Sequence, residues 1–220
     1  MRVLVTGHTG YIGSKLTPML LAKGYDVVGL DTDLFKDCTF TGELADVPHI
    51  WKDVRDVTAE DVAGFDAIIH LAALSNDPLG DYDPGLTETI NDQASVNIAR
   101  MAKAAGVRRF LFASSCSNYG AAGQDFMKED SPLDPITPYG VSKVAVEKAV
   151  GPLADETFCP VFLRASTAYG VSPRLRFDLV LNNLVAWAFT TGKVMLKSDG
   201  SPWRPVVHVE DICSAYIALL

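Results

Sequence analysis

Tyr139 and Lys143 stand four residues apart in the stretch YGVSK, so a helix would carry both side chains on one face. A lysine ammonium beside a phenol favours the phenolate and lowers a pKa that is normally about 10. A phenolate can accept the proton of a substrate hydroxyl while a hydride leaves the same carbon. Because an isolated Tyr/Lys pair of this spacing is usually structural, its place in the fold decides whether this chemistry is available.

A second group of reactive side chains lies in the stretch SSCSNYG, residues 114–120. It follows a predicted strand, so a serine hydroxyl there can hold the substrate oxygen while Tyr139 takes the proton. Cys116 has a thiol whose ordinary pKa is about 8.5, so it could also donate a proton. The alternative for Cys116 is that it fills a small apolar pocket.

The stretch TGHTGYIG near the start places Gly7, Gly10 and Gly13 three residues apart, between a predicted strand and a predicted helix. Gly7 permits a sharp turn, Gly10 lets a pyrophosphate approach the backbone, and Gly13 allows close packing of the helix. Tyr11 and Ile12 stand where the helix N-terminus would face the phosphates. The pattern predicts a dinucleotide site formed by these residues.

Asp31 ends the second predicted strand, where a carboxylate can accept both ribose hydroxyls of the dinucleotide. A carboxylate there would repel a 2′-phosphate, which favours NAD over NADP. Asp33 could share this role, and a solvated turn is the alternative for both residues. Asp53 and Val54 follow the next short segment and could hold the adenine, although a surface turn fits them nearly as well.

The elements that must position these groups alternate between strands and helices. The apolar runs predicted as strands are 2–7, 25–31, 67–74, 108–115 and 160–167, and the helical patterns are 13–24, 87–106 and 137–151. This alternation predicts an α/β fold, a Rossmann-type doubly wound parallel sheet with ligands at the carboxyl ends of its strands.

We expect a division into a dinucleotide-binding domain over 1–167, which carries the serine, tyrosine and lysine, and a small substrate-binding region that begins at 168–220. Segments of that region would return to the first domain. The last apolar helix, 208–220, has no Gly, Asn or Pro to close it. We therefore expect the substrate-binding region to be incomplete and the natural protein to be longer.

Bulk properties restrict the possible partners. The chain has 220 residues, 48% of them hydrophobic, and a net charge of −8, which argues against nucleic acid as the main partner. The apolar stretch 179–189 is too short to span a bilayer, and the start shows no signal peptide. The four cysteines lack metal-ligand spacing, so we expect reduced thiols, no metal and a cytoplasmic protein.

In combination, the motifs resemble those of the extended short-chain dehydrogenase/reductases, in the NAD-dependent sugar-nucleotide epimerase/dehydratase family. The resemblance covers all 220 residues. It is carried by TGHTGYIG (6–13), HLAAL (70–74), SSCSNYG (114–120), YGVSK (139–143) and VHVED (207–211).

Carried over by position, the resemblance implies that Tyr139 is the base, that Lys143 assists it and binds the ribose, and that Ser115 holds the substrate hydroxyl. It also implies cofactor contacts from Leu71, Ala72, Ala73 and Asn91. Asn91 could instead be a polar residue at a helix end. Family members commonly dimerise through the two helices that correspond to 87–106 and 137–151, so a homodimer is expected.

The resemblance also bears on the reaction. Sugar-nucleotide 4,6-dehydratases carry Asp and Glu directly after the catalytic hydroxyl residue, where this chain has Cys116 and Ser117. This departure favours a 4-epimerase that acts by transient oxidation at C4 of a nucleotide-diphosphate sugar. A dehydratase, with Cys116 as a possible acid for 5,6-elimination, and a dehydrogenase or reductase remain open. A non-catalytic NAD-binding regulator is the alternative outside the enzymes.

Substrate contacts are expected from the last third of the chain. Arg204 matches a family arginine that binds the nucleotide diphosphate, and Thr167 stands where many members have an asparagine. Asn183 could donate to a phosphate or pack within a helix. Arg174 and Arg176 are further candidates, with solvated surface roles as the alternative. The sugar and the base of the nucleotide stay open at this point.

Overall fold

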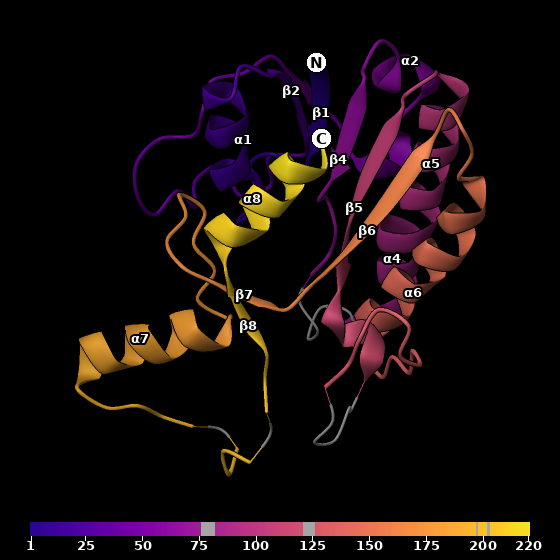
Figure 1. Ribbon diagram of the computed structural model, residues 1–220. Coiled ribbons are helices and arrows are strands. Elements are labelled where there is room, and N and C mark those ends of the chain that lie inside the picture. Colours follow the sequence, from indigo (N-terminus) through magenta and orange to yellow (C-terminus); the bar gives the residue numbers. More distant parts are fainter. Residues whose placement is uncertain (76–81, 121–125, 197, 202) are drawn as a thin grey trace.

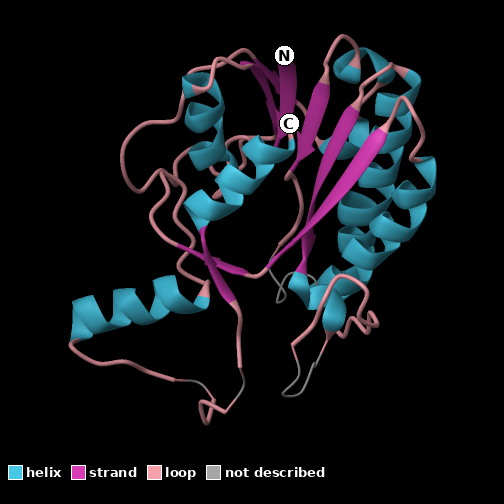
Figure 2. Cartoon of the chain, in the orientation of Figure 1, coloured by secondary structure: helices cyan, strands magenta, loops and turns pink. Residues whose placement is uncertain are grey.

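The computed structural model describes residues 1–75, 82–120, 126–196, 198–201 and 203–220. Within these residues a six-stranded sheet has the order β3-β2-β1-β4-β5-β6, and each pair of neighbouring strands is parallel. Helices cover both faces of this sheet (Figure 1; Figure 2). The predicted Rossmann-type doubly wound α/β fold is confirmed.

The elements agree closely with the predicted runs. The strands are β1 (Arg2–Thr6), β2 (Asp26–Asp31), β3 (His49–Trp51), β4 (Ala67–His70), β5 (Arg109–Ser115), β6 (Cys159–Ala165), β7 (Thr167–Tyr169) and β8 (Val206–His208). The α-helices are α1 (Gly13–Ala22), α2 (Ala59–Val62), α4 (Pro84–Thr87), α5 (Ala94–Ala104), α6 (Pro138–Val150), α7 (Val180–Thr191) and α8 (Val209–Leu219).

Each face of the sheet has its own apolar core, because side chains along a strand point alternately to opposite faces. Leu4 of β1 belongs to the cluster that includes Val146 of α6. Its neighbour Val5 belongs to the other cluster, together with Ile212 of α8. Helices α5 and α6, the second of which carries both Tyr139 and Lys143, therefore cover one face, while α1 and α8 cover the opposite face (Figure 1).

After β6 the chain leaves the main sheet. The run predicted as one strand over 160–167 is divided, because the backbone N–H of Thr167 donates to Pro205 O and β7 pairs with β8 in a separate sheet. From there α7 extends away from the main sheet, whereas α8 returns and packs against α1 (Figure 1). No helix in the described ranges combines the length and apolar character that a membrane span requires.

The long helix predicted over 87–106 has a wider turn within it. A π-helix, Glu88–Gln93, joins α4 to α5. Buried Asn91 lies in this π-helix, where its amide binds the backbone of Leu74 in the loop after β4. Because π-turns depend on such tertiary contacts and cluster at functional sites, helical periodicity alone does not reveal them.

Candidate functional site

The glycine loop between β1 and α1 is a tightly packed turn. Gly7 has a φ of 73°, and a Cβ there would lie 2.8 Å from the backbone nitrogen of Ala72. A Cβ at Gly13 would overlap the carbonyl oxygen of Gly7. The expected sharp turn at Gly7 is therefore present, and Gly13 permits close packing against the turn itself.

The N-terminus of α1 has the properties of an anion site. Its N-cap residue, Ile12, makes no side-chain cap bond, and the first turn carries no acidic side chain. The positive end of the helix is thus left for a ligand such as a pyrophosphate. Tyr11 contributes differently, since its phenol donates to Gly170 O at 2.8 Å and its own carbonyl accepts from Ser172 Oγ at 2.7 Å.

Asp31 lies at the carboxyl end of β2, beside the glycine loop. Its Oδ2 accepts the backbone N–H of Thr9 at 3.1 Å, and its Oδ1 accepts that of Thr32 at 2.8 Å. These bonds fix the carboxylate at the loop while the residue stays partly exposed. The geometry fits a carboxylate that accepts ribose hydroxyls, and together with α1 it fits a dinucleotide.

The structure gives Asp53 and Val54 definite structural roles. The Asp53 side chain caps a 3-10 helix, Val54–Asp56, by accepting the backbone N–H of Arg55. Hydrogen bonds from the Arg55 guanidinium lower the pKa of Asp53. Val54 is buried in the core. These contacts shape the turn after β3, and the expected adenine contact stays a prediction.

A chain of buried hydrogen bonds runs from the end of β4 to the π-helix. The backbone N–H of Ala72 donates to Thr6 Oγ1 at 3.3 Å, and Thr6 Oγ1 lies 2.7 Å from His70 Nδ1. His70 Nε2 lies 2.8 Å from Ser95 Oγ, which donates to Asn91 O at 2.6 Å. Because the Ser95 hydrogen is used by Asn91, Nε2 must carry the imidazole proton and Nδ1 must accept from Thr6.

This chain of bonds requires neutral His70, and burial lowers the pKa of His70 to about 3. The Asn91 amide extends it, since it donates to Leu74 O and accepts the Leu74 N–H, both at 2.8 Å. Asn91 therefore holds the segment that contains Leu71, Ala72 and Ala73. The predicted contact between Asn91 and the cofactor remains untested, and the structure shows Asn91 positioning the segment.

Tyr139 and Lys143 lie on one side of α6, as their spacing predicts. The helix begins at Pro138, and Thr137 caps it by accepting the N–H of Gly140 at 3.2 Å. Lys143 Nζ lies 4.6 Å from the centre of the Phe112 ring and 5.3 Å from the centre of the Tyr139 ring. Burial lowers the pKa of Lys143 to about 7.

The hydroxyl loop, which we define as residues 114–120, forms a short 3-10 helix over Cys116–Tyr119. Ser115 is its N-cap, since Ser115 Oγ accepts the N–H of Ser117 and donates to Ser117 Oγ, both at 3.1 Å. Burial raises the pKa of the partly exposed Cys116, and the nearby positive charge of Arg204 opposes this shift. The structure thus brings Ser115, Cys116 and Arg204 into one region.

The remaining substrate candidates are more dispersed. Thr167 begins β7, and exposed Arg204 precedes β8. The Asn183 amide donates to Phe177 O at 2.9 Å, so it binds the segment that precedes α7. Its neighbour Asn182, which sequence reasoning missed, accepts the N–H of Gly170 at 3.1 Å and thereby connects α7 to β7.

Two further arginines also have structural partners. Arg174 is buried and lies 3.4 Å from Asp33, at the adenosine end of the expected cofactor site. Arg176 donates to Ser75 Oγ at 2.7 Å and pairs with Asp178. Arg176 therefore connects the segment after β4 with the segment before α7.

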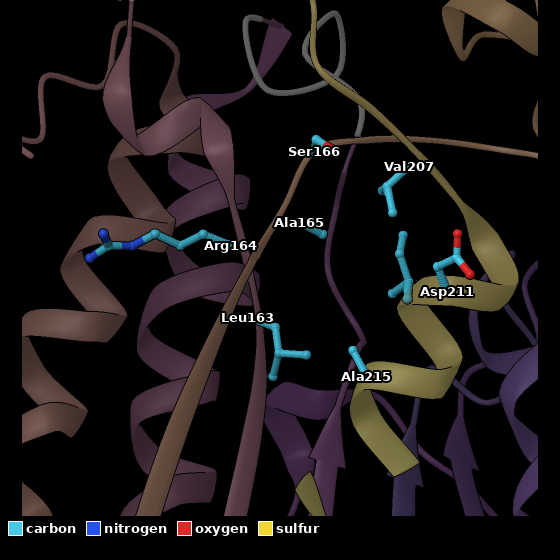
Figure 3. A pocket seen from close by; sticks show the side chains of 8 residues that line it. Leu163, Arg164, Ala165, Ser166, Val207, Asp211 and Ala215 are labelled. Atoms are coloured by element: carbon cyan, nitrogen blue, oxygen red, sulfur yellow. The ribbon is translucent and has the colours of Figure 1, made fainter. Parts of the chain in front are cut away.

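A cavity of about 320 Å³ lies between β6 and α8 (Figure 3). Leu163 and Ala165 line it from β6, and Val207 and Ile212 line it from the opposite side. None of Ser115, Tyr139 and Lys143 lines this cavity. The β6 residues that line the cavity lie at the carboxyl end of that strand, and Ala165 pairs with Ser115 of β5. The cavity therefore borders the candidate site without being lined by its three reactive residues.

Comparison with known proteins identifies the family. The model of the NAD dependent epimerase/dehydratase family matches residues 3–220. The chain belongs to this family. It is an NAD-dependent enzyme of the epimerase/dehydratase type, and the predicted resemblance is confirmed.

Among curated members of the epimerase/dehydratase family, the UDP-glucose 4-epimerase of Mycolicibacterium smegmatis is 31% identical over 228 residues. The match covers 99% of this chain and 72% of that relative. Both epimerases and dehydratases occur among the solved structures that resemble this chain.

Two solved structures illustrate this range. The NAD-dependent NDP-hexosamine 5,6-dehydratase TunA, from tunicamycin biosynthesis, is 27% identical with a TM-score of 0.88, and the match covers 99% of this chain and 71% of TunA. The UDP-glucose 4-epimerase of Thermus thermophilus, solved with NAD, is 28% identical with a TM-score of 0.83. That match covers 100% of this chain and 74% of the epimerase.

Proposed function

We propose that this enzyme is a 4-epimerase of a nucleotide-diphosphate sugar, with a UDP-sugar as the first candidate substrate. The observation that carries the proposal is the Tyr139/Lys143 pair on α6 together with a hydroxyl loop that has no carboxylate in the two positions after Ser115. Elimination of water across C5 and C6, after oxidation at C4, needs an additional base and acid, whereas epimerisation needs only proton and hydride transfer at C4. The UDP-glucose 4-epimerase relatives support this choice.

Within this proposal, Tyr139 takes the proton of the sugar 4-hydroxyl and later returns it to the 4-keto oxygen. Ser115 holds the same oxygen by a hydrogen bond. Bound NAD supplies the acceptor and donor of the hydride at C4. The 4-keto sugar rotates between the two transfers, so that C4 regains a hydride on its opposite face. Because C4 regains the hydride and its oxygen regains the proton, no net oxidation occurs.

Lys143 supports the base by its charge. Its ammonium lies near the Tyr139 ring, and a phenolate there would in turn favour the protonated lysine. Because Lys143 is almost fully buried, water screens this interaction little. The Tyr139 phenolate and the Lys143 ammonium would therefore stabilise each other.

Holding NAD would fall to the glycine loop, the N-terminus of α1 and Asp31. The tight turn at Gly7 and the uncapped helix end suit the pyrophosphate, and the Asp31 carboxylate suits the adenosine ribose. The segment Leu71–Ala73 lies beside Gly7 and would border the cofactor. Arg204 would meet the nucleotide diphosphate.

A second candidate function is dehydration by elimination, with Cys116 as the acid. Burial raises the pKa of the Cys116 thiol, which keeps it protonated at neutral pH and able to donate a proton. The similarity to the 5,6-dehydratase TunA supports keeping this candidate. It differs from epimerisation in its product, which has lost a molecule of water.

The decisive experiment incubates the protein and NAD with a panel of UDP-, dTDP- and GDP-sugars, and analyses products by mass spectrometry and NMR of the sugar ring. An epimer of unchanged mass supports the proposal, whereas loss of water supports the dehydratase. Tyr139→Phe should reduce turnover by about 100-fold or more, as expected for removal of a general base, with NAD binding little changed. Full activity of Tyr139→Phe, or accumulation of NADH, would contradict the assignment.

The expected homodimer, which would form through α5 and α6, stays a prediction. Sedimentation velocity of the protein with NAD tests it directly. A species with the mass of one chain at micromolar concentration would count against it.

A further inference from the structure

We propose that Glu147 and Arg164 form a positioning pair that holds the hydroxyl loop against α6 and so sets the distance between Ser115 and Tyr139. We call these two residues the loop anchor. The inference rests on the proposed function, because the distance between Ser115 and Tyr139 affects turnover only if both residues contact the same substrate oxygen. It concerns residues that touch neither substrate nor cofactor in the scheme above.

The position of Glu147 on α6 is the first observation. Tyr139, Lys143 and Glu147 follow one another at intervals of four residues, so one side of the helix carries all three. The Glu147 side chain is only 8% exposed. Burial of a charged carboxylate destabilises the fold unless charged and hydrogen-bonding partners offset the loss of water. Glu147 must therefore have such partners.

Those partners come from the hydroxyl loop and from β6. Glu147 Oε1 accepts hydrogen bonds from Ser114 Oγ and from Asn118 Nδ2, the latter at 2.9 Å. Arg164 Nε donates to the same oxygen at 3.0 Å, and Arg164 Nη2 donates to Oε2 at 2.6 Å. The carboxylate therefore joins three elements: α6, β6 and the loop.

Arg164 binds the loop a second time. Its Nη1 donates to the phenol oxygen of Tyr119 and to Glu129 O, both at 2.9 Å. The guanidinium also lies 5.3 Å from the centre of the Tyr119 ring. Figure 3 shows that the Arg164 side chain extends from β6 in the direction opposite to that of Leu163.

The anchor thus binds the loop on both sides of the reactive positions. Ser114 precedes Ser115 and Cys116, whereas Asn118 and Tyr119 follow them. Asn118 is fully buried and also donates to Ser114 Oγ at 3.1 Å, which closes the turn. Ser115 and Ser117 carry the hydroxyls between these fixed points, and they are hydrogen-bonded to each other at 3.1 Å.

Gly140 brings the same loop close to the first turn of α6. A Cβ at Gly140 would lie 3.0 Å from the carbonyl oxygen of Ser117. The loop therefore packs directly against the residue that follows Tyr139. Since misplacement of reacting groups by about 1 Å can cost about 100-fold in rate, this packing and the anchor have a direct consequence for turnover.

The test compares Glu147→Gln and Arg164→Met with wild type, and Asp155→Asn is the matched control. Asp155 forms an ion pair with Lys103 at 2.6 Å, outside the anchor, and an asparagine can still accept the backbone N–H of Thr157. We expect kcat to fall about 10- to 100-fold in both anchor variants, with KM and NAD affinity within about threefold of wild type. The control should retain wild-type kcat.

Cysteine labelling gives a readout that needs no substrate. Cys116 lies within the loop, exposed Cys38 and Cys159 are internal references, and buried Cys213 reports global unfolding. Alkylation by a maleimide, located by peptide mass analysis, should become at least about tenfold faster at Cys116 in both variants while Cys213 stays protected.

The two variants change the charge near Cys116 in opposite senses, which separates loop loosening from electrostatics. Loss of the Glu147 charge favours the thiolate, whereas loss of the Arg164 charge disfavours it. Faster labelling in both variants therefore reports a loosened loop. If either variant exposes Cys213, Tyr119→Phe serves in its place, because it removes only the hydroxyl group that Arg164 binds. This variant should accelerate Cys116 labelling by a smaller factor.

The outcomes distinguish the inference from the proposed function. Unchanged Cys116 labelling in the variants overturns the anchor, and faster labelling with wild-type kcat overturns its positioning role. Wild-type protein that turns over no sugar nucleotide contradicts the proposed function, whereas the anchor is then decided by the labelling alone.

Discussion

Lys143 Nζ lies 5.3 Å from the centre of the Tyr139 ring, and both side chains belong to the same face of α6. The ammonium also lies 4.6 Å from the centre of the Phe112 ring, so it lies near two aromatic rings, and the residue is almost fully buried. This placement strengthens its effect on the phenol and raises the cost of burying its charge.

Replacement of Lys143 by an apolar residue should therefore stabilise the fold and reduce activity. Because burial lowers the pKa of Lys143 from 10.5 to about 7, the unfolded chain binds more protons than the folded one between these values. The loss of folding stability caused by burying the Lys143 charge is complete below about pH 7 and disappears as the pH rises to 10.5. Lys143→Met should raise the melting temperature by about 2–4 °C per kcal/mol gained, and reduce kcat about 100-fold or more.

Calorimetry at pH 6.5 and pH 9.5, without added NAD, measures this effect. The advantage of Lys143→Met over wild type should shrink at the higher pH. Exposed Lys148 on the same helix provides the control, and Lys148→Gln should leave both stability and kcat near wild type. A less stable Lys143→Met protein would contradict the assigned cost of burial.

His70 should make stability depend on acid pH. Its folded pKa is lowered from 6.5 to about 3, with burial as the main cause and the charge of Lys143 as a smaller one. The associated stability is complete above about pH 6.5 and is lost as the pH falls toward 3, at up to about 1.4 kcal/mol per pH unit. His70→Asn should be less stable at pH 7 and should show a shallower loss between pH 6.5 and 4.

Urea unfolding at a series of pH values measures these slopes. Carboxylates also titrate in this range, so the difference between wild type and variant is the relevant quantity. His49→Gln, which changes an exposed histidine outside this chain of buried hydrogen bonds, serves as the comparison. Equal slopes for His70→Asn and wild type would mean that His70 is protonated in the folded protein.

Cys116→Ser separates the two candidate reactions. If the enzyme is an epimerase, the thiol is not a proton donor and kcat should change less than about fivefold. If it eliminates water through Cys116, the rate should fall about 100-fold or more, because a serine hydroxyl is a far weaker acid. Product formation by mass spectrometry measures both cases, with exposed Cys159→Ser as the control.

Gly13→Ala tests the cofactor cradle. The added methyl group would overlap the Gly7 carbonyl oxygen, and overpacking of this kind costs about 1–3 kcal/mol. We expect NAD affinity, measured by calorimetric titration, to fall about tenfold or more. Gly151→Ala is the control, since a Cβ there would meet only Phe162 at an ordinary 3.9 Å. Unchanged NAD affinity in Gly13→Ala would place the pyrophosphate elsewhere.

The sequence predicts well the local geometry of the segments that carry the candidate site residues. The Tyr139/Lys143 spacing, the glycines of the first turn and the acid at the end of β2 all depend on short segments whose geometry is set locally. The family match and the parallel sheet confirm that these segments belong to a Rossmann-type enzyme.

The parts that were missed depend on contacts across the fold. Glu147 has helical spacing to Lys143, yet its partner Arg164 lies on β6 and no local pattern connects them. The bond between the Asn91 amide and Leu74, and the π-turn that contains Asn91, have no signal in the local sequence, and the expected cofactor contact of Asn91 stays a prediction. His70 reads as part of an apolar strand, and its two ring nitrogens are satisfied by β1 and α5.

Tyr11 connects the cofactor cradle to the last third of the chain. Its phenol and its carbonyl oxygen bind Gly170 and Ser172, so the turn where we expect the pyrophosphate shares hydrogen bonds with the segment that follows β7. If a ligand orders the glycine turn, ordering the segment after β7 costs less conformational entropy, and the reverse also holds. If the dinucleotide and the sugar nucleotide bind on these two sides, we expect each ligand to tighten the binding of the other by the same factor.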